Sequence, residues 1–178
     1  MSRGFTLIEV VVTVVLFTAL ALAVAQLDIF YDRVVLFQKA SIEVVAGGNA
    51  VVDAVRTAGL QARRVVAAHT FSGVEYGSGA TAVVFELPAV DAEGAVLPDT
   101  YDYVAVDASG ASAFRRTDAA PGSARLSGEK RLTNVLGALG FSYDTPDVPS
   151  VRSVTVDATT SAATAQLHLR GQVRLRNP

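Results

Sequence analysis

Glu9 is the one ionisable side chain in an apolar stretch near the start of the chain. The stretch runs from Phe5 to about Leu27, and its other polar members are threonines and Gln26. A carboxylate at membrane depth costs roughly 2.5–3.5 kcal/mol on insertion scales and usually marks a functional site. About 20 apolar residues are needed for a helix to cross the hydrocarbon core, so this stretch predicts a membrane span. Glu9 is therefore the first candidate functional residue.

The rest of the chain offers few groups at catalytic or metal-binding spacing. It has no cysteine, which excludes disulfides, thiolate metal sites and cysteine nucleophiles. His69 and His168 have no second ligand at a helical or zinc-finger spacing, so we expect them to face solvent. Asp144 and Asp147 in "DTPDVPS" lack the alternating acids and the glycine of an EF-hand, which favours a simple turn.

Two sequence patterns for enzyme chemistry are also missing. Lys130 in "SGEKR" lacks the upstream glycine spacing and the following Ser or Thr of a phosphate loop, and no serine follows the nucleophile-elbow pattern. We therefore predict no enzyme activity, no cofactor and no bound metal.

A long N-terminal helix would position Glu9. Beyond the span, apolar residues recur at steps near the helical period, at Phe30, Val34, Phe37, Val44, Val52, Val55, Ala62 and Val66. Gly47 and Gly48 weaken this pattern by about 1 kcal/mol each, so we expect a bend or local melting there. A helix from Phe5 to Val66 would be about 90 Å long. Half of it would need partners outside its own chain.

From about Thr70, short β-branched and aromatic runs alternate with turn residues. The runs predict antiparallel strands at "TAVVFELP", "TYDYVAVDAS", "ASAFRRT", "GFSYDTP", "SVTVDATT" and "AQLHLRGQVRLRN". In the last run, Gly171 indicates a bulge or a change of face, and "KRLTNVLGALGFSYD" is expected to hold a short helical turn before a strand. The predicted fold class is α+β, a long N-terminal helix packed against a C-terminal antiparallel β-sheet.

The opening "RGFTLIEV" resembles the processing site of type IV pilins and pseudopilins. The matching features are a short basic leader, Gly4, Phe5 and Glu9, followed by an apolar span and a long helix. In that family a membrane peptidase cuts after the glycine and methylates the new N-terminal residue. The resemblance thus implies cleavage after Gly4, N-methylation of Phe5 and a role in filament assembly for Glu9.

The resemblance also implies a pilin-like division of the chain and a set of partners. Residues 1–4 would be the leader, 5–27 the membrane-spanning and filament-core half of the helix, 28–69 its amphipathic half, and 70–178 an exported β-rich domain. The partners would be prepilin peptidase, a principal pilin, other minor pilins or pseudopilins, and an inner-membrane assembly platform. The N-terminus would be cytoplasmic in the bacterial inner membrane, and the C-terminal domain would be periplasmic or on the cell surface, in a pilus filament after assembly.

A physical argument supports the assembly role of Glu9. Cleavage would give Phe5 a free amine that is largely protonated at neutral pH. In a packed filament this amine can pair with Glu9 of a neighbour, and losing one partner would leave a buried unpaired charge, at about 3–5 kcal/mol. The pair would then fix the axial register. The alternative is that Glu9 lies near enough to the membrane surface to reach water.

The tail "LTNVLGALGFSYD…VTVDATTSAATAQLHLRGQVRLRNP" is similar to minor subunits of the PilW and J-type pseudopilin group. We therefore predict a minor pilin or pseudopilin of a pilus, a type II secretion system or a competence system. Two features depart from many pilins, because the chain has no cysteine pair near its C-terminus and no proline in the span.

Two alternatives explain the apolar N-terminal segment without assembly into a filament. The stretch "ALALAVAQLD" could end a secretory signal near Ala23 to Ala25. The chain could also be an uncleaved single-pass protein whose exported β domain binds a ligand.

Charge is unevenly distributed along the C-terminal part. Residues 70–123 hold eight acids and two arginines, whereas residues 124–178 hold four acids and seven bases. This pattern fits either solvated strand faces or complementary surfaces on neighbouring subunits. Seven bases without clustered aromatic residues do not predict a nucleic-acid partner.

Overall fold

The computed structural model describes residues 6–163 and 165–176. The chain divides into two compact units, residues 1–39 and 40–178. Helix α1 (Leu7–Gln61) forms the described part of the first unit and enters the second. The other elements are β1 (Arg64–Val65), β2 (Ala68–Phe71), β3 (Val74–Gly77), β4 (Ala82–Val90), β5 (Val96–Ser109), β6 (Ser112–Asp118), β7 (Gly128–Thr133), β8 (Leu136–Tyr143), the 3-10 helix η1 (Val148–Ser150), β9 (Ser153–Ala162) and β10 (Ala165–Arg174).

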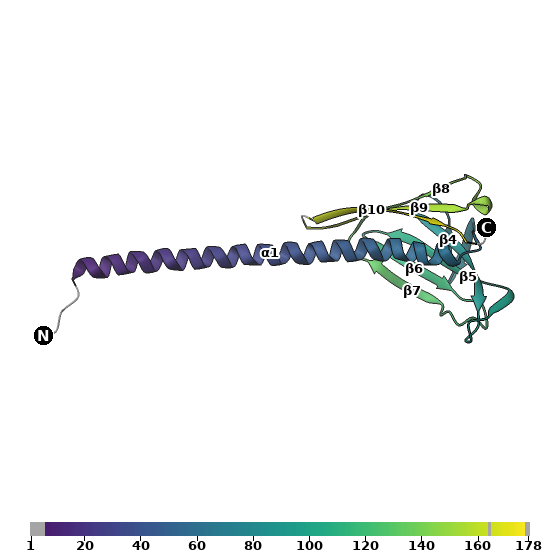
Figure 1. The fold of residues 1–178 in the computed structure, drawn as a ribbon, viewed down its shortest axis with the longest axis horizontal. Helices are drawn as coiled ribbons and strands as arrows, with labels where there is room; N and C mark the ends of the chain where they lie inside the picture. The colour runs from purple at the N-terminus through teal and green to yellow at the C-terminus, as the bar shows by residue number, and fades with distance from the viewer. Residues whose placement is uncertain (1–5, 164, 177–178) are drawn as a thin grey trace. The chain divides into compact units, whose positions relative to one another are not determined.

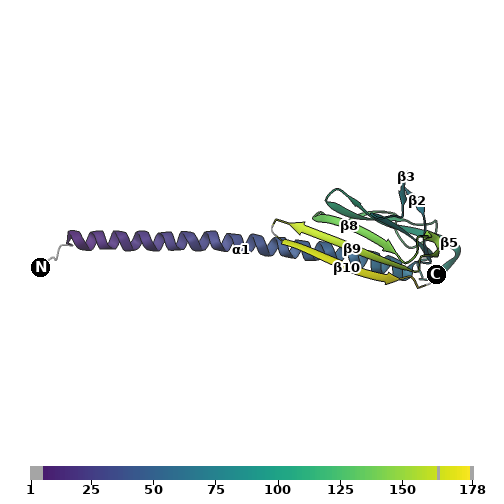
Figure 2. The ribbon, with the colours of Figure 1, turned by 90° about the horizontal axis from the view of Figure 1, so that it is seen from above.

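In the second unit, one face of the C-terminal part of α1 packs between two antiparallel sheets. Five strands lie in the order β1-β4-β5-β6-β7, three in the order β10-β9-β8, and β2 pairs with β3 in a hairpin. Strands β8 to β10 lie on one side of the helix and β6 and β7 on the other (Figure 1), and Figure 2 shows β8 to β10 running along the C-terminal part of the helix. The predicted α+β class is confirmed, with several sheets in place of one.

Burial explains why this part of α1 packs there. Its buried residues recur at helical spacing, so they form one apolar face: Ala40, Val44, Gly47, Gly48, Val51, Ala54, Val55, Ala58 and Gly59. The face joins a core with inward residues of both sheets, such as Phe85 and Val104 on one and Phe141 and Val156 on the other. Neither sheet nor helix could bury its apolar face alone.

The expected melting at Gly47 and Gly48 does not occur, because the helix continues through both residues. They serve close packing instead. A Cβ at position 47 would collide with Thr133 Oγ1, and one at position 48 would lie 2.7 Å from Leu169 Cδ1. The Thr160 hydroxyl also donates to the Val44 carbonyl oxygen at 2.8 Å. Tertiary contacts therefore outweigh the low helix propensity of glycine.

The helix ends at Gln61, earlier than the predicted amphipathic half at 28–69. Arg64 and Val65 instead pair with Glu86 and Phe85 of β4. Val65 joins the main core and Val66 packs in a second cluster, so consecutive residues face opposite sides of the sheet. That alternation has the period of a strand, and the helical extension to 69 was wrong for this reason.

Two further sequence expectations were wrong. Gly171 causes neither a bulge nor a change of face, because the β9–β10 register is unbroken from Ala165 to Arg174. A Cβ at Gly171 would lie 2.7 Å from Val52 Cγ1, so the glycine makes room for the helix. The stretch "KRLTNVLGALGFSYD" holds strand residues of β7 and β8 rather than a helical turn. Its backbone groups form hydrogen bonds with the neighbouring strands β6 and β9.

Candidate functional site

Glu9 lies in the first turn of α1 and contacts Thr6. Its Oε2 atom accepts hydrogen bonds from the backbone N and the Oγ1 of Thr6, each at 2.9 Å. In return the Glu9 N–H donates to Thr6 Oγ1 at 3.4 Å. This reciprocal pair is a capping box, in which two side chains satisfy backbone donors at the start of a helix. The signal for it, Thr three residues before Glu, was present in the sequence and was missed.

The other two residues expected at this site cannot be placed. Gly4 and Phe5 lie outside the residues that the structure describes. Their roles in cleavage and methylation, and that of Glu9 in assembly, stay predictions.

Hydroxyl groups deeper in the apolar segment are satisfied within the helix. Thr13 Oγ1 donates to the Glu9 carbonyl oxygen at 2.6 Å, and Thr18 Oγ1 donates to the Val14 carbonyl oxygen at 2.8 Å. Such bonds remove the cost of placing a hydroxyl in hydrocarbon. The Glu9 carboxylate is then the one charged group between positions 6 and 27.

The described residues of the first unit expose apolar side chains along their whole length. Phe17 is 72% exposed and Phe37 54% exposed, and neither is covered by other parts of the chain. This helix is also the one described helix that is long and apolar enough to cross a membrane. A helix that is apolar on every side belongs in lipid or in a protein core. The exposed apolar side chains of this helix therefore need lipid or another protein to cover them.

Residues 1–25 match the prokaryotic N-terminal methylation motif. The match covers the basic leader, Glu9 and most of the apolar segment, and it supports a type IV pilin-like subunit. The motif implies processing by prepilin peptidase and assembly with other pilins, and together with the apolar helix it fits anchoring in a membrane. It indicates a structural protein rather than an enzyme. No curated protein matches the chain.

The outer face of the five-stranded sheet carries a cluster of charged and aromatic residues. Glu86 is 1% exposed, and Arg64 binds it with two parallel bonds, Nε to Oε1 at 3.0 Å and Nη2 to Oε2 at 2.9 Å. These bonds raise the pKa of the Arg64 guanidinium, whereas burial, followed by the charge of Glu86, raises the pKa of Tyr103. Both groups are thereby held in one protonation state, which suits structure better than proton transfer.

His69 belongs to the same cluster, against the expectation that it faces solvent. Its ring stacks on Tyr103 with centroids 3.7 Å apart, and Nε2 lies 2.8 Å from Asp118 Oδ2. His168 does face solvent, with its side chain 62% exposed. No three metal-ligating side chains come together among the described residues.

Asp144 and Asp147 lie in a turn, as expected, and their carboxylates accept hydrogen bonds from the same segment. Asp144 Oδ1 accepts from the Arg152 N–H at 3.1 Å, and Asp147 Oδ2 accepts from the Ser150 hydroxyl. The segment is a loop with a 3-10 turn, η1.

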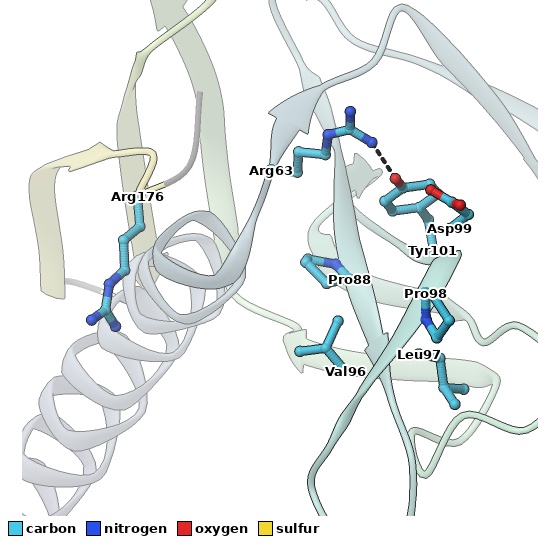
Figure 3. A pocket seen from close by; sticks show the side chains of 8 residues that line it. All are labelled: Arg63, Pro88, Val96, Leu97, Pro98, Asp99, Tyr101 and Arg176. Carbon is cyan, nitrogen blue, oxygen red and sulfur yellow. Dashed lines mark hydrogen bonds between the residues drawn. The ribbon is translucent and has the colours of Figure 1, made fainter.

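A groove of about 560 Å³ lies where β1, β4 and β5 meet the end of β10 (Figure 3). Its walls include Arg63 and Arg176, and prolines 88 and 98 line it together with Val96. Arg63 Nη1 donates to the Tyr101 hydroxyl, as the dashed line marks. None of the lining residues is a serine, cysteine or histidine, so the groove lacks a nucleophile with an adjacent base.

Proposed function

We propose that this chain is a minor pilin or pseudopilin, a structural subunit of a type IV pilus-like filament. Prepilin peptidase cuts it after Gly4 and methylates Phe5. The α1 segment that crosses the inner membrane then moves into the filament core, while the N-terminus starts cytoplasmic and the sheet domain is exported. The observation that carries the proposal is the methylation motif at 1–25 joined to an exposed apolar helix with a single acid.

Glu9 changes partner in this account. In the single chain its carboxylate caps the helix through Thr6. A cap of this kind contributes about 0.5–2 kcal/mol. Once Glu9 is buried among neighbouring subunits, leaving its carboxylate without the Phe5 amine of a neighbour would cost about 3–5 kcal/mol, which is more than the cap contributes. The same acid thus orders the helix before assembly and fixes the register after it.

Two matched variants separate these roles of Glu9. Thr6→Ala removes the cap and keeps the carboxylate, whereas Glu9→Gln keeps the side-chain size and removes the charge. We expect both variants to be cleaved. Glu9→Gln should reduce incorporation at least tenfold in filaments sheared from cells, and Thr6→Ala should reduce it by at most about fivefold, because about 1 kcal/mol of capping is lost.

The ratio of chain in sheared filaments to chain in membranes, measured by immunoblot, tests this difference. Equal losses for the two variants would assign Glu9 to capping alone. Normal incorporation of Glu9→Gln would refute the assembly role. An intact protein that never leaves the membrane would favour the second candidate, an anchored protein with an exported ligand-binding domain.

A further inference from the structure

Arg115 lacks the carboxylate partner that comparable arginines have. Three arginines in the described part of the chain are half-buried, and two of them bind buried acids. Arg116 Nε lies 2.9 Å from Asp107 Oδ1, and Arg125 Nη1 lies 2.6 Å from Asp102 Oδ2. Within the same residues Arg115 forms no ion pair, and its Nε is buried without a hydrogen-bond acceptor. Arg115 is thus a half-buried cation without a carboxylate partner, which makes it a candidate for binding an anion from outside the chain.

The surroundings of Arg115 form a continuous basic depression. Two hollows of about 280 Å³ and 270 Å³ share Arg115 and Lys130. The first lies between α1 and β7 and includes Arg131 and Asp53. The second follows the start of β7 at Gly128. We call these two hollows together the β7 groove.

Positive charge exceeds negative charge in the β7 groove. Lys130 lies directly opposite Arg115 in the β6–β7 ladder, and like charges at such positions repel. Glu129 is engaged by Arg116 on the neighbouring strand. Asp53 lines the groove but forms no ion pair with any described residue. An external anion would offset the repulsion between Arg115 and Lys130 and give the Arg115 guanidinium the carboxylate partner that it lacks.

The shape of the groove favours a polypeptide over a compact ion. The cations are distributed along two adjoining hollows rather than around one point. The groove also follows β7, the outer strand of its sheet, whose ladder partner is β6. Outer strands bind extended chains through free backbone groups, and arginine pairs with carboxylates through two parallel bonds.

We propose that the β7 groove binds an acidic polypeptide segment, whose carboxylates pair with Arg115, Lys130 and Arg131. This inference rests on the proposed function only for the source of the segment, which would be a neighbouring subunit in the filament. Binding of an acidic segment does not itself depend on cleavage after Gly4.

The test uses the full chain in zwitterionic detergent micelles and fluorescein-labelled hexaglutamate as the probe. Fluorescence anisotropy at low salt should show saturable binding that weakens as salt is added. The variant Arg115→Gln/Lys130→Gln should lose about tenfold in affinity, because each removed pair contributes a few-fold. The control Arg152→Gln/Arg174→Gln removes two exposed arginines outside the groove and should change affinity less than twofold. Asp53→Asn should tighten binding about twofold.

Equal losses in the groove and control variants would refute the proposal, since any basic surface would then suffice. Absence of saturable binding would refute it as well. Inorganic phosphate that displaces the probe at lower concentration than unlabelled hexaglutamate would overturn the assignment to a polypeptide. Far-UV circular dichroism and the urea midpoint confirm that each variant is folded. The filament proposal fails separately: if protein from the cells that make it keeps an uncleaved N-terminus, probe binding by the full chain still leaves the groove proposal standing.

Discussion

At the scale of residues, Asp102 and Tyr143 show how the sheet domain holds buried polar groups through specific hydrogen-bond partners. Asp102 is fully buried and accepts from the Ala120 N–H, the Ser123 hydroxyl and Arg125. Tyr143 is held in the same way, because its hydroxyl donates to the carbonyl oxygens of Gly79 and Ala82 at 3.0 and 3.1 Å. These contacts fix the loops at the strand ends.

Tyr143 makes the stability of the folded chain depend on pH in the alkaline range. Burial raises the pKa of Tyr143 from 10.0 to about 12. Between these values the unfolded chain has released the proton and the folded chain has not, so stability is complete below pH 10 and is lost as pH rises through 12. We expect the urea midpoint to fall from pH 10 upward, and to fall less steeply in Tyr143→Phe. Tyr31→Phe, at an exposed position, should keep the wild-type slope; an unchanged slope in Tyr143→Phe would contradict this assignment.

Single residues were partly predictable from the sequence. Glu9 was located by composition, because one acid among apolar residues has few explanations. Its hydrogen bonds to Thr6 were not predicted, because Glu9 was interpreted from its position in an apolar span and not from the local Thr-x-x-Glu capping pattern. The ion pair of Arg116 with Asp107 follows from the β5–β6 register, and no local rule gives register across loops.

At the scale of elements, glycines set how closely helix and strands approach. Gly47, Gly48 and Gly59 on α1 and Gly171 on β10 each lie where a Cβ would be within 3 Å of a neighbouring side chain. The sequence suggested weakness at Gly47 and Gly48 and a bulge at Gly171. Both expectations came from local backbone propensity. The glycines are instead explained by close packing between elements that are distant in the sequence.

The role of Gly171 can be measured against a second strand glycine. In Gly171→Ala the new methyl group would lie 2.7 Å from Val52 Cγ1 and 3.3 Å from Val156 Cγ1. In Gly140→Ala the nearest atom would be 3.9 Å away. We expect a loss of about 1–3 kcal/mol of unfolding free energy for the first and within about 0.5 kcal/mol for the second. Equal values from urea unfolding would show that the close approach does not matter.

The strands themselves were predicted better than their ends. The six predicted runs all contain strand residues of β4, β5, β6, β8, β9 and β10, because β-branched alternation is a strong signal. β1, β2, β3 and β7 were missed. β1 has two residues, and β7 is a largely polar outer strand without apolar alternation.

At the scale of the whole molecule, the two compact units differ in what they expose. The described residues of 7–39 expose apolar side chains, whereas the unit from 40 to 178 has a buried core of its own. The first needs lipid or other subunits, and the second can face water. This difference, with the motif at 1–25, is what the filament proposal explains.

The N-terminus of the mature protein tests that proposal most directly. The measurement is mass spectrometry of the N-terminal peptide from protein purified from the cells that make it. The account predicts a peptide that begins at Phe5 and carries an N-methyl group. A protein that still begins at Met1, or one cut near Ala25 as a secretory signal would be, would contradict it.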